Sequence, residues 1–295
     1  MEKLLSDKKA IAFFVLPALL LFLLVVYYSV VQSGYYSLLS WDGIGKASFV
    51  GLKNYVNLFV NNTDGFTRAI YNSIILAVLT VGIQLPLALF FAIVLAKHIK
   101  GETFFRTAFF IPVTISTTVI GQLWLKIYHP SYGMLNVLLD SLGLNSLSRG
   151  WLGNTSTALI ACFVPIVWQY VGYHMLLLYT SIKSIPDELF EAAYTDGATN
   201  LQIAFKIIIP LIRPMLQVCT VFSVVGSLKV FDLIYVLTNG GPAHASEVPS
   251  TLMFNTIFFR NQYGYGSAMS IFIFIECLVF TVIIQKFMKR EDANS

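Results

Sequence analysis

The chain of 295 residues is strongly apolar, with 57% hydrophobic and 12% charged residues and a formal net charge of +4. Soluble domains carry about 25% charged residues, so this composition excludes a pair of ordinary soluble domains and indicates a polytopic membrane protein. The small net charge is no sign of nucleic-acid binding, and the three cysteines all fall within apolar runs, so no disulfide framework is predicted.

Six apolar stretches are long enough to cross a bilayer, which takes about 20 residues in a helix. A cleaved signal peptide is an alternative for the first stretch, but its length and the lack of an A-x-A site favour a retained span. We therefore predict an all-α polytopic membrane protein, one transmembrane domain over 1–295, with spans at about 10–31, 70–96, 107–125, 157–179, 203–230 and 268–287.

Basic residues predict the orientation of these spans, because cytoplasmic loops are enriched in Lys and Arg. The side that carries both termini holds about twice as many as the other side. Tyr and Trp gather at the opposite ends of the spans, as in an aromatic belt. Both termini are therefore expected in the cytoplasm. The basic residues on that side are Lys3, Lys8, Lys9, Lys97, Lys100, Arg106, Lys183, Lys206, Arg213, Lys286, Lys289 and Arg290.

The loop 182–210, between the fourth and fifth spans, is too polar to cross the membrane. Ser184 precedes Asp187 by three residues, the spacing of a capping box, which predicts a helix start. Gly197 is suited to end that helix. An ordinary interfacial amphipathic helix would have the same pattern. Three residues would share one face, and two of them are small enough for close approach of a partner: Leu189, Ala192 and Ala193.

The same loop resembles a family signature. Glu191-Ala192-Ala193, Gly197 and Ile207-x-Ile209-Pro210 match the EAA pattern E-A-A-x3-G-x9-I-x-L-P of importer-type ABC permeases, with Ile209 in place of Leu. The resemblance implies that this cytoplasmic loop holds a coupling helix, which docks on a separate ATPase subunit. The residues that it implies for coupling are Glu191, Ala192, Ala193, Asp196, Gly197 and Pro210.

Two further segments resemble the sugar-uptake branch of that family, the maltose/glycerol-phosphate-like, binding-protein-dependent permeases. Phe49 to Tyr55 matches F-x-G-L-x-N-Y, and Phe231-Asp232 followed by Leu237 to Pro242 matches F-D…L-T-x-G-G-P. The resemblance implies a permease subunit of an ATP-driven importer in a prokaryotic cytoplasmic membrane. Its implied partners are a second, usually different, permease chain, two cytoplasmic ATPase subunits that bind ATP and Mg²⁺, an extracytoplasmic solute-binding protein and a carbohydrate.

Motifs for catalysis are missing from the sequence. It contains no P-loop pattern, no H-E-x-x-H and no G-x-S-x-G. We therefore expect this chain to bind no cofactor and no metal, and to be a permease rather than an enzyme. The four histidines are too scattered for a metal site: His98, His129, His174 and His244.

Polar residues inside the spans are costly there and usually face a cavity or a partner helix. Trp, Tyr and Gln together suit sugars, because aromatic rings stack on sugar faces and amides pair with hydroxyls. Helix–helix contact is the better explanation for any one of these residues alone, whereas the fourth and fifth spans taken together favour a pathway. The candidates for a substrate pathway are Gln84, Gln122, Trp168, Gln169, Tyr170, Tyr173, Gln217, Ser223, Ser227 and Lys229.

Glu276 is a carboxylate in the middle of the sixth span. We expect it to form an ion pair, either with Lys229 or with a partner subunit, while a neutral state and a proton-carrying role remain open. The last of these would fit a proton-coupled secondary transporter, which leaves the EAA spacing as coincidence. An ABC permease for an amino acid, polyamine or inorganic anion is a further alternative. A lipid-modifying membrane enzyme would need a cluster of His or Asp, which the sequence lacks.

Overall fold

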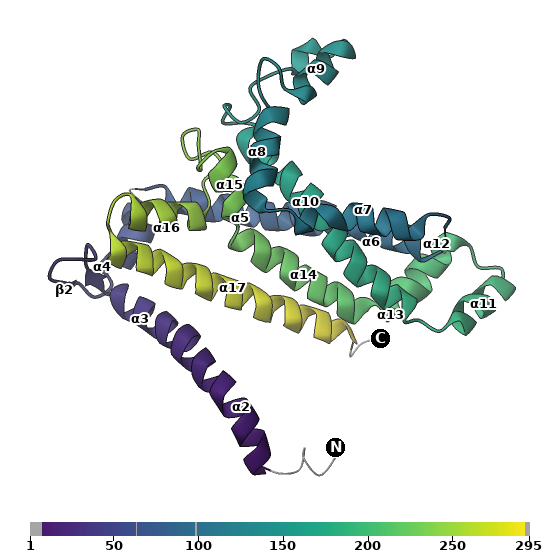
Figure 1. The fold of residues 1–295 in the computed structure, drawn as a ribbon, viewed down its shortest axis with the longest axis horizontal. Helices are drawn as coiled ribbons and strands as arrows, with labels where there is room; N and C mark the ends of the chain where they lie inside the picture. The colour runs from purple at the N-terminus through teal and green to yellow at the C-terminus, as the bar shows by residue number, and fades with distance from the viewer. Residues whose placement is uncertain (1–7, 63, 98, 293–295) are drawn as a thin grey trace. The chain divides into compact units, whose positions relative to one another are not determined.

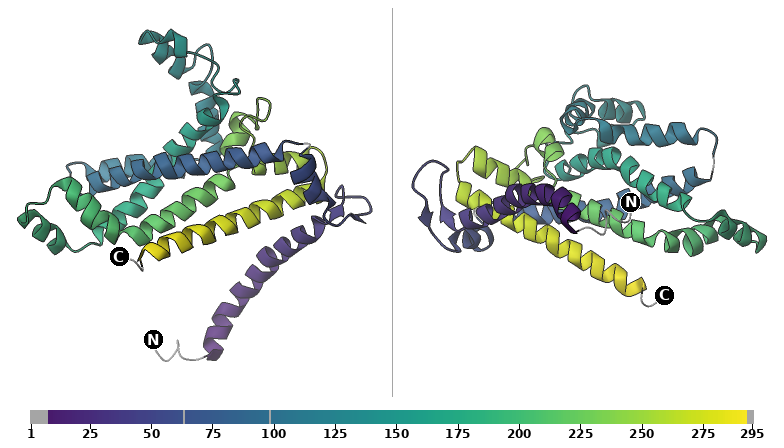
Figure 2. Two further views of the ribbon diagram at one scale, coloured as in Figure 1. Left: turned by 180° about the vertical axis from the view of Figure 1, so that it is seen from behind. Right: turned by 60° about the horizontal axis from the view of Figure 1, so that its bottom comes forward.

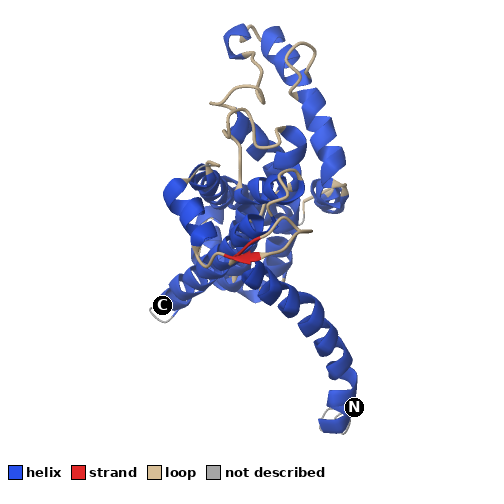
Figure 3. Cartoon of the chain, turned by 90° about the vertical axis from the view of Figure 1, so that its left-hand side faces the viewer, coloured by secondary structure: helices blue, strands red, loops and turns tan. Residues whose placement is uncertain are grey.

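The computed structural model describes residues 8–62, 64–97 and 99–292, so the predictions on Lys3, on His98 and on the two termini lie outside the described residues. Helix dominates, and Figure 3 shows strand only at one short hairpin. This confirms the prediction of an all-α protein. The strands are β1 (Leu39–Ser40) and β2 (Ser48–Phe49), antiparallel with Leu39 opposite Phe49.

Figure 1 labels many of the helices along the chain, and the longest connections precede α10 and α16. The helices are α2 (Lys8–Phe22), η1 (Leu23–Tyr27), α3 (Tyr28–Tyr36), α4 (Lys53–Val56), η2 (Asn57–Asn61), α5 (Phe66–Leu79), η3 (Thr80–Gln84), α6 (Leu85–Ala96), α7 (Glu102–Thr114), α8 (Thr117–Ile127), α9 (Met134–Ser141), η4 (Asn145–Leu147), α10 (Ala158–Lys183), α11 (Asp187–Thr195), α12 (Asn200–Ile203), η5 (Ala204–Ile208), α13 (Ile209–Leu211), α14 (Arg213–Leu228), α15 (Asp232–Leu237), α16 (Pro249–Phe258) and α17 (Tyr263–Asp292).

Five helical stretches are long and apolar enough to cross a membrane, and six if one bent pair counts as a span. The bent pair is α7 and α8, which meet at 98° where 107–125 is predicted as one span (Figures 1 and 2). The chain is extended at Ile115 and Ser116, in a run rich in Thr and Ser. Thr114 Oγ1 donates to Ile111 O at 2.7 Å, and such hydroxyls compete with helix continuation. The five stretches are Ala12–Tyr36, Phe66–Ala96, Ala158–Lys183, Arg213–Leu237 and Tyr263–Met288.

Two prolines of the helical segments, Pro86 and Pro210, follow π-helical turns. The turn η3 ends just before Leu85-Pro86, and η5 ends just before Ile209-Pro210. Proline has no N–H and clashes with the carbonyl four residues earlier. A wider turn with one extra residue relieves that clash without breaking the helix.

The chain divides into two compact units, Met1–Asp64 with Met253–Phe274, and Gly65–Leu252 with Ile275–Ser295. In the first unit, Asn54 is buried and its Nδ2 donates to Ser37 O and Leu39 O, both at 2.8 Å. Tyr55 Oη donates to Ser37 Oγ at 2.8 Å. The Asn-Tyr of the F-x-G-L-x-N-Y segment therefore ties this segment to the residues that end α3 and begin the hairpin.

In the second unit, α10 is the helix against which α6 and α7 pack. The core there includes Ala88 and Ala92 of α6 with Met175 and Leu178 of α10, all fully buried. The small side chains of α6 let α10 approach closely. A second core in this unit joins α14 to α5. Leu228 of α14 is buried there beside residues of both α5 and α17.

The helix α11 begins without the predicted capping box. Its N-cap is Pro186, with no side-chain hydrogen bond, and Ser184 Oγ instead donates backwards to Ser181 O at 2.7 Å. The prediction was wrong because Ser184 lies within the last turn of the preceding helical segment, where a hydroxyl bonds to the carbonyl of that turn. The capping box of this loop is formed by Thr199 and Gln202, at the start of α12.

Candidate functional site

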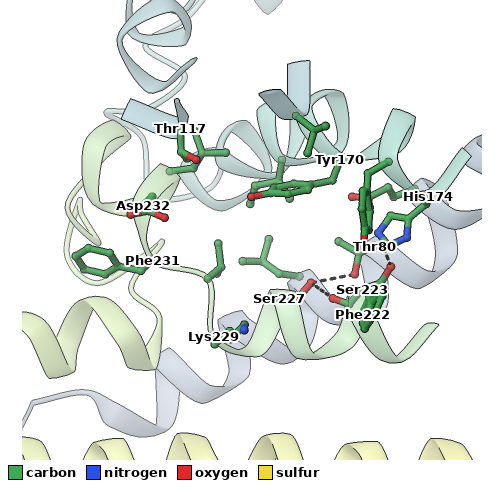
Figure 4. A pocket seen from close by; sticks show the side chains of 18 residues that line it. Thr80, Thr117, Tyr170, His174, Phe222, Ser223, Ser227, Lys229, Phe231 and Asp232 are labelled. Carbon is green, nitrogen blue, oxygen red and sulfur yellow. Dashed lines mark hydrogen bonds between the residues drawn. The ribbon is translucent and has the colours of Figure 1, made fainter. Parts of the chain in front are cut away.

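A cavity of about 370 Å³ lies in the second unit, between α5 with η3, the α7–α8 bend, α10 and α14 (Figure 4). Its walls are mostly apolar and aromatic, with a few polar groups, as in most binding sites for small molecules. Tyr170 and Ser227 lie across the space from one another. The lining residues are Leu76, Thr80, Gln84, Val113, Thr117, Ile166, Tyr170, Tyr173, His174, Phe222, Ser223, Gly226, Ser227, Lys229, Val230, Phe231, Asp232 and Leu233.

A chain of hydrogen bonds connects three walls of the cavity at one side (Figure 4). His174 Nε2 on α10 lies 3.2 Å from Ser223 Oγ on α14. Ser227 Oγ donates to Ser223 O at 2.8 Å and lies 3.0 Å from Thr80 Oγ1 of η3. All four side chains are buried. At this side of the cavity the walls are therefore joined by exchangeable polar contacts as well as by apolar packing.

Two buried polar atoms in the lining have no hydrogen-bond partner among the described residues. They are Gln84 Oε1 and His174 Nδ1, and both side chains are less than 5% exposed. Such groups are normally satisfied in folded proteins. Gln84 Oε1 is an acceptor and would take a hydrogen bond from a hydroxyl, and His174 Nδ1 can donate or accept according to its tautomer. Aromatic rings close by offer flat apolar surfaces: Tyr170, Tyr173, Phe222 and Phe231.

The coupling loop ends α11 with a Schellman motif. Ala198 N donates to Ala193 O at 2.9 Å, and Gly197 N donates to Tyr194 O at 3.1 Å. Gly197 has φ +75°, in the left-handed region that favours glycine. The predicted role of Gly197 as the turn residue is confirmed.

The two alanines of the EAA segment differ in burial. Ala193 is 9% exposed and belongs to the same core as Ile182, Ile185 and Ile203, whereas Ala192 is exposed. The prediction that both alanines, with Leu189, offer one docking face is therefore wrong for Ala193, because the loop folds back onto the end of the bundle. The outward surface is formed by Glu191, Ala192, Asp196 and Gly197, with Leu189 at 43% exposure.

The sequence model of one protein family, the binding-protein-dependent transport system inner membrane component, matches residues 9–291. The chain belongs to this family. It is a multi-helix permease of ABC-type transport, and the resemblance drawn from the EAA loop is confirmed.

Curated relatives and solved structures agree with this family. The permease is 40% identical to the probable ABC transporter permease protein YurN of Bacillus subtilis (strain 168), over 96% of this chain and 98% of that one. It is 34% identical to the trehalose/maltose transport system permease protein MalF of Thermococcus litoralis, over 82% and 81%. Its fold matches a chain of a bacterial alginate ABC transporter, crystallised in complex with alginate pentasaccharide-bound periplasmic protein, with TM-score 0.83, 23% identity and coverage of 95% and 94%.

The cavity brings together six of the ten residues that were predicted for a pathway. The other four lie elsewhere in the permease. Gln122 is exposed on α8, Trp168 is 39% exposed on α10, and Gln217 is half-buried on α14. Gln169 is outside the lining but buried beside it, since its Nε2 donates to Oγ1 of Thr117, a residue of the cavity wall, at 3.4 Å. The six in the lining are Gln84, Tyr170, Tyr173, Ser223, Ser227 and Lys229.

Among the lining residues of the permease that were not predicted for a pathway are Thr80 and Phe222. Thr80 was not predicted, because a hydroxyl residue in a span is compatible with any position. Phe222 was not predicted, because an aromatic residue in an apolar run carries no sign of which face it occupies. For both, helical spacing from the predicted residues was the available signal: Thr80 precedes Gln84 by one turn, and Phe222 is adjacent to Ser223.

Glu276 of the permease does not pair with Lys229, one of the two expected partners. Among the described residues no ion pair joins the two side chains, and Glu276 Oε2 is buried without a hydrogen-bond partner. Lys229 is the C-cap residue of α14 and lines the cavity. A cation at a helix C-terminus interacts favourably with the helix dipole, which gives Lys229 a reason to be there without Glu276.

Proposed function

We propose that this permease forms the translocation pathway of an ATP-driven, binding-protein-dependent importer for a carbohydrate. The observation that carries the proposal is the cavity between α10 and α14. Its lining includes Gln84 and His174, whose Oε1 and Nδ1 are buried without a hydrogen-bond partner among the described residues, next to aromatic rings. A sugar has hydroxyls for the polar atoms and apolar C–H faces for the rings.

The substrate class is also supported by the relatives. One of them is named for trehalose and maltose, and the alginate transporter was solved with a saccharide-loaded partner. The F-x-G-L-x-N-Y and L-T-x-G-G-P segments point to the same branch. A short saccharide, taken from an extracytoplasmic solute-binding protein, is therefore the proposed cargo.

Energy would reach the cavity through α11. The chain carries no P-loop, so ATP and Mg²⁺ would bind to two separate cytoplasmic ATPase subunits, with a second permease chain completing the pathway. The exposed Glu191 and Ala192 would contact an ATPase, with both termini of the permease on the same side. In the chain, α11 is preceded by α10 and followed by α14, which form opposite walls of the cavity.

Alternating access then amounts to separating these two walls and closing them again. The contacts between His174 and Ser223, and between Thr80 and Ser227, are single hydrogen bonds across the walls. Each such bond contributes about 1 kcal/mol net. A modest bias from ATP binding is enough to exchange them for contacts with the solute or with water.

The test is uptake by the purified complex of permease, ATPases and binding protein in liposomes. Radiolabelled trehalose, maltose and alginate oligosaccharides serve as probes. Gln84→Leu is expected to lower ATP-dependent uptake about tenfold, because the amide is lost from a buried site. Gln122→Leu is the matched control, since Gln122 is exposed on α8, and is expected to transport like the wild type.

The results that would contradict the proposal are specific. ATP-dependent uptake of an amino acid, polyamine or anion instead of the saccharides would keep the importer and change its cargo. Uptake that needs no ATP, collapses with the proton gradient and is abolished by Glu276→Gln would favour a secondary transporter. That second candidate is supported by the buried carboxyl of Glu276, whose Oε2 has no hydrogen-bond partner.

A further inference from the structure

Four side chains meet where α6 and α10 end and α7 begins. Tyr179 Oη donates a hydrogen bond to Glu102 Oε1, and Arg106 Nη1 lies 3.7 Å from the same oxygen. The Arg106 guanidinium lies 5.1 Å from the centroid of the Tyr179 ring, and Lys183 Nζ lies 5.9 Å from it. Lys183 Nζ also donates to Ala96 O at 2.9 Å. We call Glu102, Arg106, Tyr179 and Lys183 the end cluster.

The end cluster joins three helices by contacts that are stronger than ordinary ones. The bond between Tyr179 and Glu102 links α10 to α7, and the bond between Lys183 and Ala96 links α10 to α6. Hydrogen bonds with an ionised partner are roughly twice as strong as neutral ones. Tyr179 is only 6% exposed, so its hydroxyl depends on Glu102 for a partner.

Further along the same helices, the packing leaves no room for sliding. A Cβ at Gly172 of α10 would lie 1.8 Å from Phe109 O of α7, so the two backbones touch. The rings of Phe91 on α6 and Phe109 stack with centroids 4.6 Å apart. Packed interiors transmit displacement rather than absorb it. The helices α6, α7 and α10 therefore behave as one body, closed at its end by the end cluster.

This body connects α11 with one wall of the cavity. The helix α10 carries Tyr170 and His174 in the cavity and Tyr179 at its end. Directly after α10, Phe190 and Ala193 of α11 pack into the core that α6 and α10 share. The opposite wall, α14, contacts α10 at the cavity through the bond between Ser223 and His174, and its Cys219, Met215 and Leu216 pack into the same apolar core.

We propose that the end cluster makes α6, α7 and α10 follow α11 as one body, so that displacement of α11 changes the separation of α10 and α14 at the cavity. Its members are positioning residues outside the EAA loop. The inference rests on the proposed function in one respect, namely that α11 is displaced by an ATPase. The inference goes beyond that function by naming the helices that α11 would move first and the side chains that hold those helices together.

The test follows the distance between spin labels at Val164 of α10 and Val218 of α14, both exposed, in the complete complex with cysteines otherwise removed. ATP with vanadate serves as the probe, so the identity of the solute does not matter. Tyr179→Phe keeps the ring and removes the bond to Glu102. It is expected to lower the population of the ATP-induced distance about three- to tenfold, with ATP hydrolysis and thermal stability retained.

A matched control and a second pair of variants sharpen the result. Tyr132→Phe removes a hydroxyl from an exposed ring that stacks on His129, and is expected to respond like the wild type. Glu102→Ala should reproduce the defect of Tyr179→Phe. Combining the two should add little, because both remove the same interaction.

Three outcomes would overturn the inference. One is an unchanged distance response in both Tyr179→Phe and Glu102→Ala. Another is a response that falls only in step with thermal stability, since that would make the end cluster merely structural. The third is a wild-type complex that shows no ATP-dependent distance change, which would overturn the proposed function as well and is recognised before any variant is compared.

Discussion

At Gly172 the backbones of α10 and α7 are in contact, and no side chain fits between them. Small residues at such crossings are what lets helices in membranes pack closely. The obstacle at Gly172 is a carbonyl, Phe109 O, rather than the tip of a flexible side chain, so it cannot turn aside. The close approach therefore depends on this one glycine.

We predict that Gly172→Ala lowers the free energy of unfolding by about 1–3 kcal/mol, because the added methyl forces α7 and α10 apart. Gly82→Ala, in η3, is the matched control, since a Cβ there meets nothing within 4 Å. The measurement is unfolding in mixed micelles. Equal stability of the two variants would show that the helices can separate at no cost.

Among helices, α11 shows most clearly what a signature in the sequence can and cannot predict. Its ends were predicted to within a residue or two, because proline, acidic residues and glycine have fixed positional preferences. Which alanine faces outward was not predictable, since Ala192 and Ala193 are adjacent and the choice depends on how the loop folds back onto Ile182 and Ile185. The π turns could not be predicted either, because a proline in a helix indicates an irregularity but not whether it is a kink, a break or a π turn.

The two alanines give a paired prediction. Ala193→Asp places a carboxylate in the core that α11 shares with the bundle, and is expected to lower stability by about 2 kcal/mol or more. Ala192→Asp alters only the exposed face, and should leave stability unchanged while weakening ATPase binding. Thermal unfolding and co-purification of the ATPase measure the two effects. The reverse pattern would mean that Ala193 is the docking residue.

For the whole molecule, the length of the apolar runs predicted five of the six spans as long apolar helices, whereas neither the bend in the third nor the cavity could be predicted. The cavity draws its lining from α5, η3, α7, α8, α10, α14 and α15, which are far apart in the sequence. Polar residues such as Gln84 and Gln122 look alike in the sequence, and only packing places one in the lining and the other on an exposed face. The sequence shows which polar residues lie in the spans, but only the tertiary structure shows which of them come together in the cavity.

The length of α10 leads to a prediction on topology. Its 26 residues extend about 39 Å at 1.5 Å per residue, more than the roughly 30 Å of a hydrocarbon core. The loop before α10 and the helix α11 after it should therefore lie on opposite sides of the membrane. In a cysteine-free background, Thr155→Cys is expected to react with an impermeant thiol reagent in intact cells, and Ala192→Cys only in inverted vesicles. Labelling of both from one side would exclude this topology.

The connections on either side of α11 are short. Ser184, Ile185 and Pro186 separate it from α10, and Asp196 to Thr199 separate it from α12. Short connections have little conformational freedom. In the proposed mechanism, a displacement of α11 is therefore transmitted almost fully to α10 and α12. A flexible Gly-Ser insert in either connection would leave the end cluster and the cavity intact. The loop would then absorb part of the displacement of α11, and less of it would reach the cavity. In the proposed mechanism, the length of these two loops therefore affects the coupling between α11 and the cavity as much as the side chains of the end cluster do.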